Sequence, residues 1–67
     1  MELIDTPNPN AKKIETNADD EKALFELENI IGVTSVFFGP GFITITKDQD
    51  IEWDMITQDI VDIFDKL

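Results

Sequence analysis

The most constraining feature of the sequence is a pair of β-rich segments separated by a short turn. Residues 33–38 (VTSVFF) and 42–47 (FITITK) are rich in β-branched and aromatic side chains. Gly39-Pro40-Gly41 lies between them, and residues of these types favour a tight reversal of the chain. The spacing therefore predicts two antiparallel strands joined as a β-hairpin.

Alternation within the two segments separates a core face from a second face. In the second segment, isoleucines alternate with threonines, so that one face is buried and the other is not. The core face then consists of four side chains: Val36, Phe38, Ile43 and Ile45. Phe37 and Phe42 are left without a place in the core. We expect them to form an apolar interaction patch, unless the N-terminal segment or Phe25 covers them.

The N-terminal part of the chain predicts a second hairpin. Residues 1–5 form a short candidate strand, and residues 11–16 form another. Between them, Thr6-Pro7-Asn8-Pro9-Asn10 breaks regular structure, because each proline fixes its own φ and restricts the residue before it. Thr6, Asn8 and Asn10 either stabilise a rigid turn through local hydrogen bonds or form a docking loop for a partner.

Two amphipathic helices complete the pattern. The first is expected to start within residues 17–21, with Asn17 or Asp19 as its N-cap, and to end at Gly32 in a left-handed conformation. Its apolar stripe is Ala23, Leu24, Leu27, Ile30 and Ile31. The second helix is expected from about Ile51 to the end of the chain. Its apolar stripe is Trp53, Ile56, Ile60, Ile63, Phe64 and Leu67, with Asp59, Asp62 and Asp65 on the opposite side.

The element order predicts the fold class. A β-β-α-β-β-α chain is typical of a two-layer α+β fold, in which an antiparallel sheet carries two helices on one face. With 67 residues, we expect one domain spanning residues 1–67, with a small core.

Composition excludes several functions. The chain contains no Cys, His, Tyr or Arg, so its residues offer no thiolate or imidazole for catalysis, zinc sites or iron–sulfur ligation. We therefore expect no catalytic residue, no metal ligand and no cofactor. The net charge of −10 disfavours nucleic acid and anionic membranes as partners. A cytoplasmic location and a monomer are the default expectations.

Carboxylates suggest two weaker alternatives. Residues 48–52 (DQDIE) begin like a calcium-binding loop, but the sixth position, which should be glycine, is Trp53. This excludes the standard site and leaves only a weak contact with a hard cation. The aspartates of the last helix form either a solvated face or a surface for a basic partner.

Three segments in combination resemble a known family. They are DTPNPNAKKIE (residues 5–15), GVTSVFFGPGFITITK (residues 32–47), and Glu52-Trp53-Asp54 followed by the spaced Ile56, Ile60 and Phe64. Together they are similar to the N-terminal domain of Nfu-type (NifU-like) iron–sulfur cluster scaffold proteins.

The resemblance implies a role in cluster assembly. In that family the cluster-binding cysteines lie in a separate C-terminal domain with a Cys-x-x-Cys motif, which this sequence lacks. The resemblance thus implies a non-enzymatic module that contacts a Cys-x-x-Cys domain or other cluster-assembly proteins. The alternative is a free-standing protein-interaction adaptor unrelated to cluster traffic. In either case the candidate contact residues are Phe37, Phe42, Gly39, Pro40, Thr6, Asn8 and Asn10.

Overall fold

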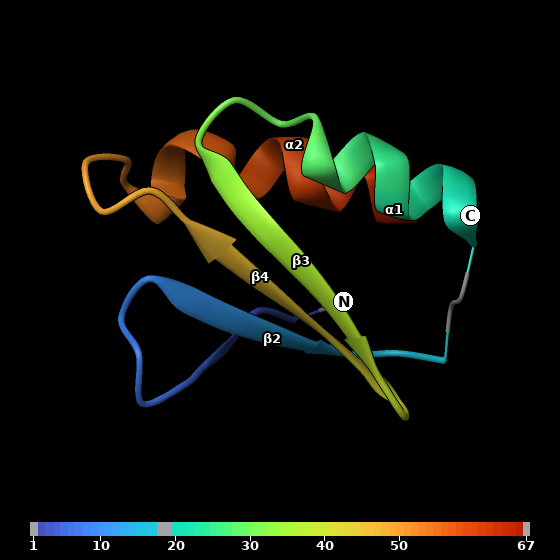
Figure 1. The fold of residues 1–67 in the computed structure, drawn as a ribbon. Coiled ribbons are helices and arrows are strands. Elements are labelled where there is room, and N and C mark those ends of the chain that lie inside the picture. Colours follow the sequence, from blue (N-terminus) through green and yellow to red (C-terminus); the bar gives the residue numbers. More distant parts are fainter. Residues whose placement is uncertain (1, 18–19, 67) are drawn as a thin grey trace.

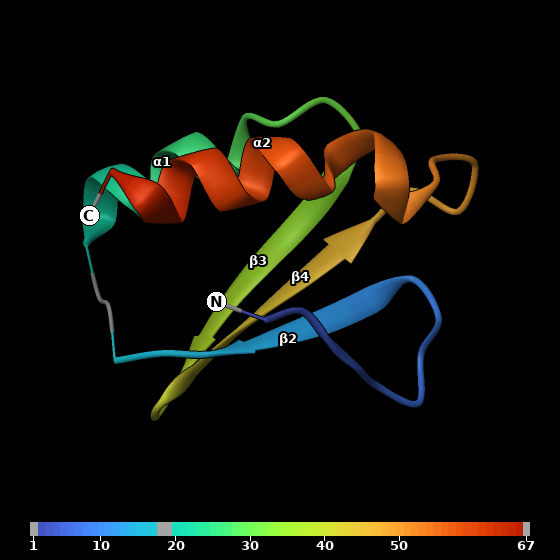
Figure 2. The ribbon, with the colours of Figure 1, turned by 180° about the vertical axis from the view of Figure 1, so that it is seen from behind.

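The computed structural model describes residues 2–17 and 20–66 and has the predicted order of elements (Figures 1 and 2). These are β1 (Ile4–Asp5), β2 (Ala11–Glu15), α1 (Glu21–Glu28), β3 (Val33–Gly39), β4 (Phe42–Lys47) and α2 (Trp53–Asp65). Met1, Asp19 and Leu67, which sequence analysis assigned to a strand, a cap and a helix stripe, lie outside the described residues.

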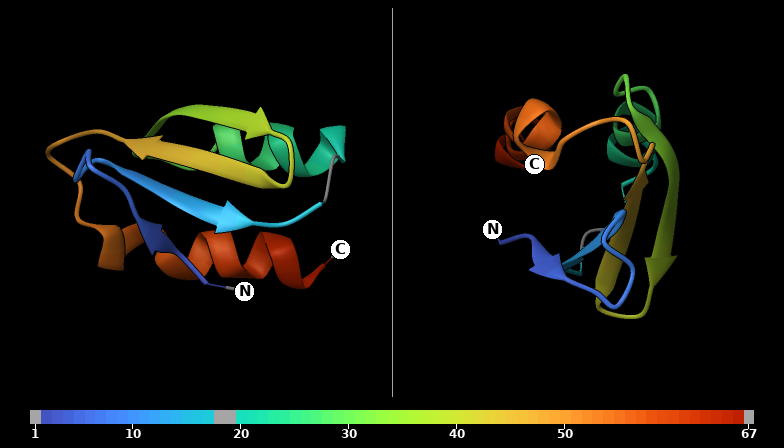
Figure 3. Two further views of the ribbon diagram at one scale, coloured as in Figure 1. Left: turned by 90° about the horizontal axis from the view of Figure 1, so that it is seen from below. Right: turned by 90° about the vertical axis from the view of Figure 1, so that its left-hand side faces the viewer.

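The sheet is four-stranded and antiparallel, with the strand order β1-β2-β4-β3. Both helices lie on one face of the sheet, and in the left view of Figure 3 they are seen behind the strands. The predicted two-layer α+β fold is therefore confirmed. The other face of the sheet carries neither helix, and we call it the open face.

The core lies between the sheet and the helices. Its most deeply buried side chains are Ile14, Leu27, Ile43, Ile45 and Ile60. The hairpin register pairs Val36 with Ile45 and Phe38 with Ile43, so that these four side chains share one face, as alternation predicted. Val36 and Phe38 are only partly buried, because β3 is the edge strand and has a neighbour on one side only.

Helix α1 is shorter than expected, and its cap is a different residue. It starts at Glu21, and the side chain of Asp20 accepts a hydrogen bond from the Lys22 amide at 2.8 Å. The expectation of Asn17 as N-cap was wrong, because the helix begins four residues later. Ile31, expected on the buried stripe, is 90% exposed since the helix ends at Glu28.

Gly32, which follows α1, has the predicted conformation but does not end the helix. Gly32 has a φ of 103°, which confirms the left-handed conformation, yet it lies just before β3 and not at the helix end. Helix α2 begins at Trp53, two residues later than expected. Within residues 2–17 and 20–66, neither helix has the length and apolar character required to cross a membrane.

Candidate functional site

The open face carries one strongly exposed aromatic side chain. Phe37 pairs with Thr44 across β3 and β4, and Thr44 pairs in turn with Lys13 of β2. Because paired residues share a face, these side chains form a row across the sheet. Phe37 is 61% exposed, so neither the N-terminal segment nor Phe25 covers it, and Phe25 is itself 66% exposed.

Phe42 has different surroundings from Phe37, although the two rings are in contact. Their centroids lie 6.1 Å apart, with the ring planes inclined at 43°. Phe42 is half-buried and pairs directly with Gly39. A Cβ atom at Gly39 would overlap the Phe42 ring, so the ring packs on the bare glycine backbone. Phe42 thus lies outside the core, as expected, but packs on Gly39, a contact that alternation did not predict; its part in an interaction patch stays a prediction.

The turn between β3 and β4 fixes this pair of rings. Gly39 and Phe42 are paired residues, so Pro40 and Gly41 are the two central residues of the hairpin turn. Gly41 has a φ of 79°. Proline at the first central position and a positive φ at the second are the signature of a type II turn. Gly39 and Pro40, both candidate contact residues, thus shape the turn in the structure.

The Thr6–Asn10 turn is held by its own side chains. The Thr6 hydroxyl lies 2.9 Å from both the Asn8 and the Ala11 carbonyl oxygens. The Asn10 amide donates to Asn8 Oδ1 at 2.9 Å. Of the two readings left open for Thr6, Asn8 and Asn10, these contacts support the structural one, and their role in docking stays a prediction.

Sequence analysis missed that Trp53 joins this turn to α2. The indole Nε1 donates to the Pro9 carbonyl oxygen at 3.0 Å. The ammonium groups of Lys12 and Lys47 lie 5.4 Å and 5.8 Å from the Trp53 ring centroid, within range for cation–π attraction. Lys47 is only 8% exposed and also donates to Asn10 Oδ1 at 3.0 Å. We call this contact between turn and helix the Trp53 clasp.

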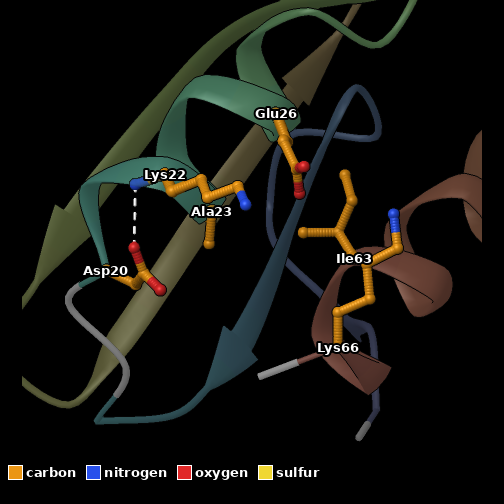
Figure 4. A pocket seen from close by; sticks show the side chains of 6 residues that line it. All are labelled: Asp20, Lys22, Ala23, Glu26, Ile63 and Lys66. Atoms are coloured by element: carbon orange, nitrogen blue, oxygen red, sulfur yellow. Dashed lines mark hydrogen bonds between the residues drawn. The ribbon is translucent and has the colours of Figure 1, made fainter.

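The concave parts of the surface are small and mixed in charge. A hollow of about 150 Å³ lies between the N-terminal part of α1 and the C-terminal end of α2 (Figure 4). Its lining includes the apolar side chains of Ala23 and Ile63 together with charged residues. A shallower hollow of about 360 Å³ lies beside the Thr6–Asn10 turn.

Neither hollow is lined by three or more acidic side chains from the described part of the chain. Among residues 2–17 and 20–66, each buried side-chain nitrogen or oxygen has a hydrogen-bond partner. In the same part of the chain, no three acidic side chains gather as metal ligands would. The Asp48 carboxylate, first in the calcium-like segment, instead accepts a hydrogen bond from the Asp50 amide at 2.9 Å.

Sequence comparison connects residues 15–67 to the family described as "Scaffold protein Nfu/NifU N terminal". The chain is 38% identical to the human mitochondrial NFU1 iron-sulfur cluster scaffold homolog, over 90% of this chain and 30% of that protein. It is 35% identical to the mitochondrial NifU-like protein 5 of Arabidopsis thaliana, over 90% of this chain and 20% of that protein. The chain thus spans less than a third of either relative.

Structural comparison gives the same fold. The crystal structure of Staphylococcus aureus protein SAV1430 superposes with a TM-score of 0.84, over 96% of this chain and 95% of that one, at 23% identity. The solution structure of SAV1430 superposes with a TM-score of 0.75. The family match, which includes α1, β3, β4 and α2, confirms the resemblance noted in the sequence. The chain belongs to the Nfu/NifU N-terminal domain family.

Proposed function

We propose that this chain is a non-enzymatic module of iron–sulfur cluster assembly that makes protein contacts and does not ligate the cluster. The observation that carries the proposal is the family match over residues 15–67. The human relative is named an iron-sulfur cluster scaffold homolog, which supports the pathway. The chain covers less than a third of either relative. We therefore propose that the cluster is carried by a different protein segment and not by these 67 residues.

The ligands that iron–sulfur clusters require support a contact role for this chain and a ligating role for another domain. Iron–sulfur clusters are held by cysteine thiolates and in some centres by histidine, and the 67 residues contain neither. The resemblance implies that a Cys-x-x-Cys domain supplies the thiolates. This chain would then position that domain or recruit a protein that delivers or accepts the cluster.

The open face is the best candidate contact surface. Phe37 exposes 61% of its surface there, beside the half-buried Phe42. Apolar surface of this kind forgoes about 1.5–3 kcal/mol of burial energy per large side chain, so its presence suggests a use in binding. Residues 29–46, which contain β3 and all of β4 except the buried Lys47, include no charged residue. A partner can therefore approach this hairpin without desolvating an ion.

The test is a titration of the ¹⁵N-labelled chain with a cluster-loaded Cys-x-x-Cys scaffold domain. We expect chemical-shift changes at Phe37, Thr44 and their neighbours, while the iron–sulfide absorbance stays with the added domain. A basic protein of similar size without a cluster serves as the control for non-specific attraction to the acidic chain.

Two outcomes would contradict the proposal. Transfer of visible iron–sulfide absorbance to this chain would show that it ligates the cluster. Absence of any shift change would leave the adaptor unrelated to cluster traffic as the better account. The cytoplasmic location stays a prediction, and the names of the human and Arabidopsis relatives place those proteins in mitochondria.

A further inference from the structure

We infer that the outer edge of β3 binds an extended peptide segment of a partner, which adds a fifth strand to the sheet and carries basic residues beyond the paired part. The inference rests on the proposed function and deepens it, because it specifies the chemistry of the protein contact.

The two edges of the sheet differ in how they are protected. At the β1 edge, the strand has only two residues, the Asp5 side chain is 90% exposed, and Pro7 follows closely. Short length, charge and proline are the features by which proteins prevent pairing at an edge. The β3 edge has seven residues, no charge and no proline within the strand. Its one irregularity is a register shift between Val33 and Ser35.

The backbone of β3 has hydrogen-bonding groups directed outward. Lys47 N donates to Asn10 O at 2.8 Å, so alternate residues of β4, including Ile43 and Ile45, direct their backbone groups toward β2. Their partners across the hairpin are Phe38 and Val36. The N–H and C=O groups of Val36 and Phe38 therefore point away from β4. No strand in the described part of the chain lies on that side.

Phe37 supplies a side-chain contact for an added strand. Its backbone groups face β4, and its ring lies on the open face at 61% exposure. A residue opposite Phe37 on an added strand would lie beside this ring, and aromatic or β-branched cross-strand pairs stabilise such an arrangement. The pattern matches recognition by strand addition, in which backbone bonds give affinity and alternate side chains give specificity.

Charge determines what flanks the paired segment. The uncharged stretch of residues 29–46 ends at acidic side chains: Glu28 precedes it, and Asp48 and Asp50 follow Lys47. The amide of Asp48 donates to the Gly32 carbonyl oxygen at 2.7 Å, which places this acidic loop beside the start of β3. A peptide lying along β3 would pass these exposed carboxylates, so Lys or Arg beyond its apolar part is complementary to them.

The same charge argues against a second copy of this chain as the occupant. Two chains that each carry −10 would repel each other along the whole approach. A basic-flanked peptide is instead attracted, and the attraction weakens with salt because the acidic groups are exposed. A partner of opposite charge is thus the occupant that the surface favours.

The experiment begins with a random twelve-residue display library selected on the immobilised protein. We expect enriched peptides in which β-branched or aromatic residues alternate, with Lys or Arg at the end that lies beside the start of β3. A resynthesised peptide should slow amide hydrogen exchange at Val36 and Phe38. Phe37→Ala should weaken its binding at least tenfold. The matched control is Phe25→Ala, which truncates an equally exposed phenylalanine on α1 and should change affinity less than twofold.

Several results would overturn the inference. These are the absence of any enriched peptide, unchanged exchange at Val36 and Phe38 on binding, or equal losses in the two variants. Protection that rises with protein concentration alone, with dimers in sedimentation, would identify a second copy as the occupant instead. Shift changes with the Cys-x-x-Cys domain but no strand addition would overturn this inference and leave the proposed function standing. Strand addition without shift changes on titration with the Cys-x-x-Cys domain would overturn the proposed function and leave this inference standing.

Discussion

Phe37 and Phe42 are neighbouring aromatic residues whose roles the structure separates. The Phe37 ring contacts the Phe42 ring and is 61% exposed. Phe42 covers Gly39, the residue with which it pairs. An aromatic ring over a cross-strand glycine compensates for the missing side chain in the sheet. Phe42 therefore contributes to the stability of the hairpin, whereas Phe37 is available for binding.

A double-mutant cycle tests the contact between Gly39 and Phe42. We expect Gly39→Ala to destabilise the fold by about 1–3 kcal/mol, because the added Cβ would overlap the ring. In the Phe42→Ala background the same change should cost much less, since the ring is absent. Urea unfolding of the four proteins measures the coupling, and equal costs in both backgrounds would show that the ring does not restrict Gly39.

Phe37→Ser should leave the melting temperature nearly unchanged, because the wild-type ring already lies largely in solvent. Thermal unfolding followed by circular dichroism measures this. A loss of several degrees would show instead that Phe37 contributes to the fold and would weaken the case for the open face as a binding surface.

Sequence patterns predicted the side of each residue in the hairpin, but not every contact. Period-two alternation correctly placed Val36 and Phe38 on the same face as Ile43 and Ile45, because the side-chain period in a strand is fixed. It did not show that Phe42 packs on Gly39. That contact depends on the exact register of the turn, which alternation alone does not specify.

The two helices differ at their N-termini in a way that predicts opposite effects of substitution. The Asp20 side chain caps α1 by accepting from the Lys22 amide. At α2, Glu52 occupies the cap position in an extended conformation, and its side chain makes no capping hydrogen bond. The longer glutamate side chain is a poorer cap than aspartate, whose carboxylate reaches the first-turn amides readily.

Exchanging the two acids tests this difference at constant net charge. We expect Asp20→Glu to destabilise the protein and Glu52→Asp to stabilise it, each by about 0.5–1 kcal/mol. Urea unfolding at one ionic strength measures both. If the two substitutions have effects of the same sign, capping does not control the stability of these helix ends.

The Trp53 clasp joins two elements that are far apart in the sequence. Because Trp53 and Pro9 are separated by 44 positions, no local pattern could predict their hydrogen bond. The helical period correctly placed Trp53 on the inner stripe, but its polar edge had no assigned partner. The cap of α1 and the start of α2 likewise depended on local backbone geometry: Asp20 caps α1 where Asn17 or Asp19 was expected, and α2 begins two residues later than expected.

Trp53→Phe should loosen the Thr6–Asn10 turn. The change removes the Nε1–H donor and weakens the attraction of Lys12 and Lys47 to the ring, for a loss of about 1–2 kcal/mol. Amide exchange at Ala11, which bonds to the Asn8 carbonyl, should accelerate. Met55→Ala is the control: its exposed side chain lies on the same helix, and we expect little change there.

Across the whole molecule, charge is distributed unevenly. Residues 29–46 are uncharged, while 15 acidic residues are spread over the rest of the chain against five lysines. On α2, Asp59, Asp62 and Asp65 are all exposed, as the helical period predicted. Asp65 also lies in the last turn of α2, where the negative end of the helix dipole disfavours an acid.

Sodium chloride should therefore raise the melting temperature at neutral pH. Self-repulsion among exposed carboxylates is screened over about 8 Å at physiological ionic strength. The double variant Asp59→Asn, Asp65→Asn reduces the magnitude of the net charge, from −10 to −8. It should be more stable at low salt, and its melting temperature should respond less to added salt. A melting temperature that stays flat with salt would show that repulsion is negligible, and one that falls would show that ion pairs outweigh it.

The Trp53 clasp also makes the protein its own optical reporter. The chain has one tryptophan and no tyrosine, so indole emission originates from a single place on the fold. That fluorophore is the first residue of α2, and its ring rests against the Thr6–Asn10 turn. Emission thus senses local opening of the clasp, whereas circular dichroism senses loss of both helices. If the emission changes at a lower temperature than the circular dichroism signal, the clasp opens before the sheet and helices separate.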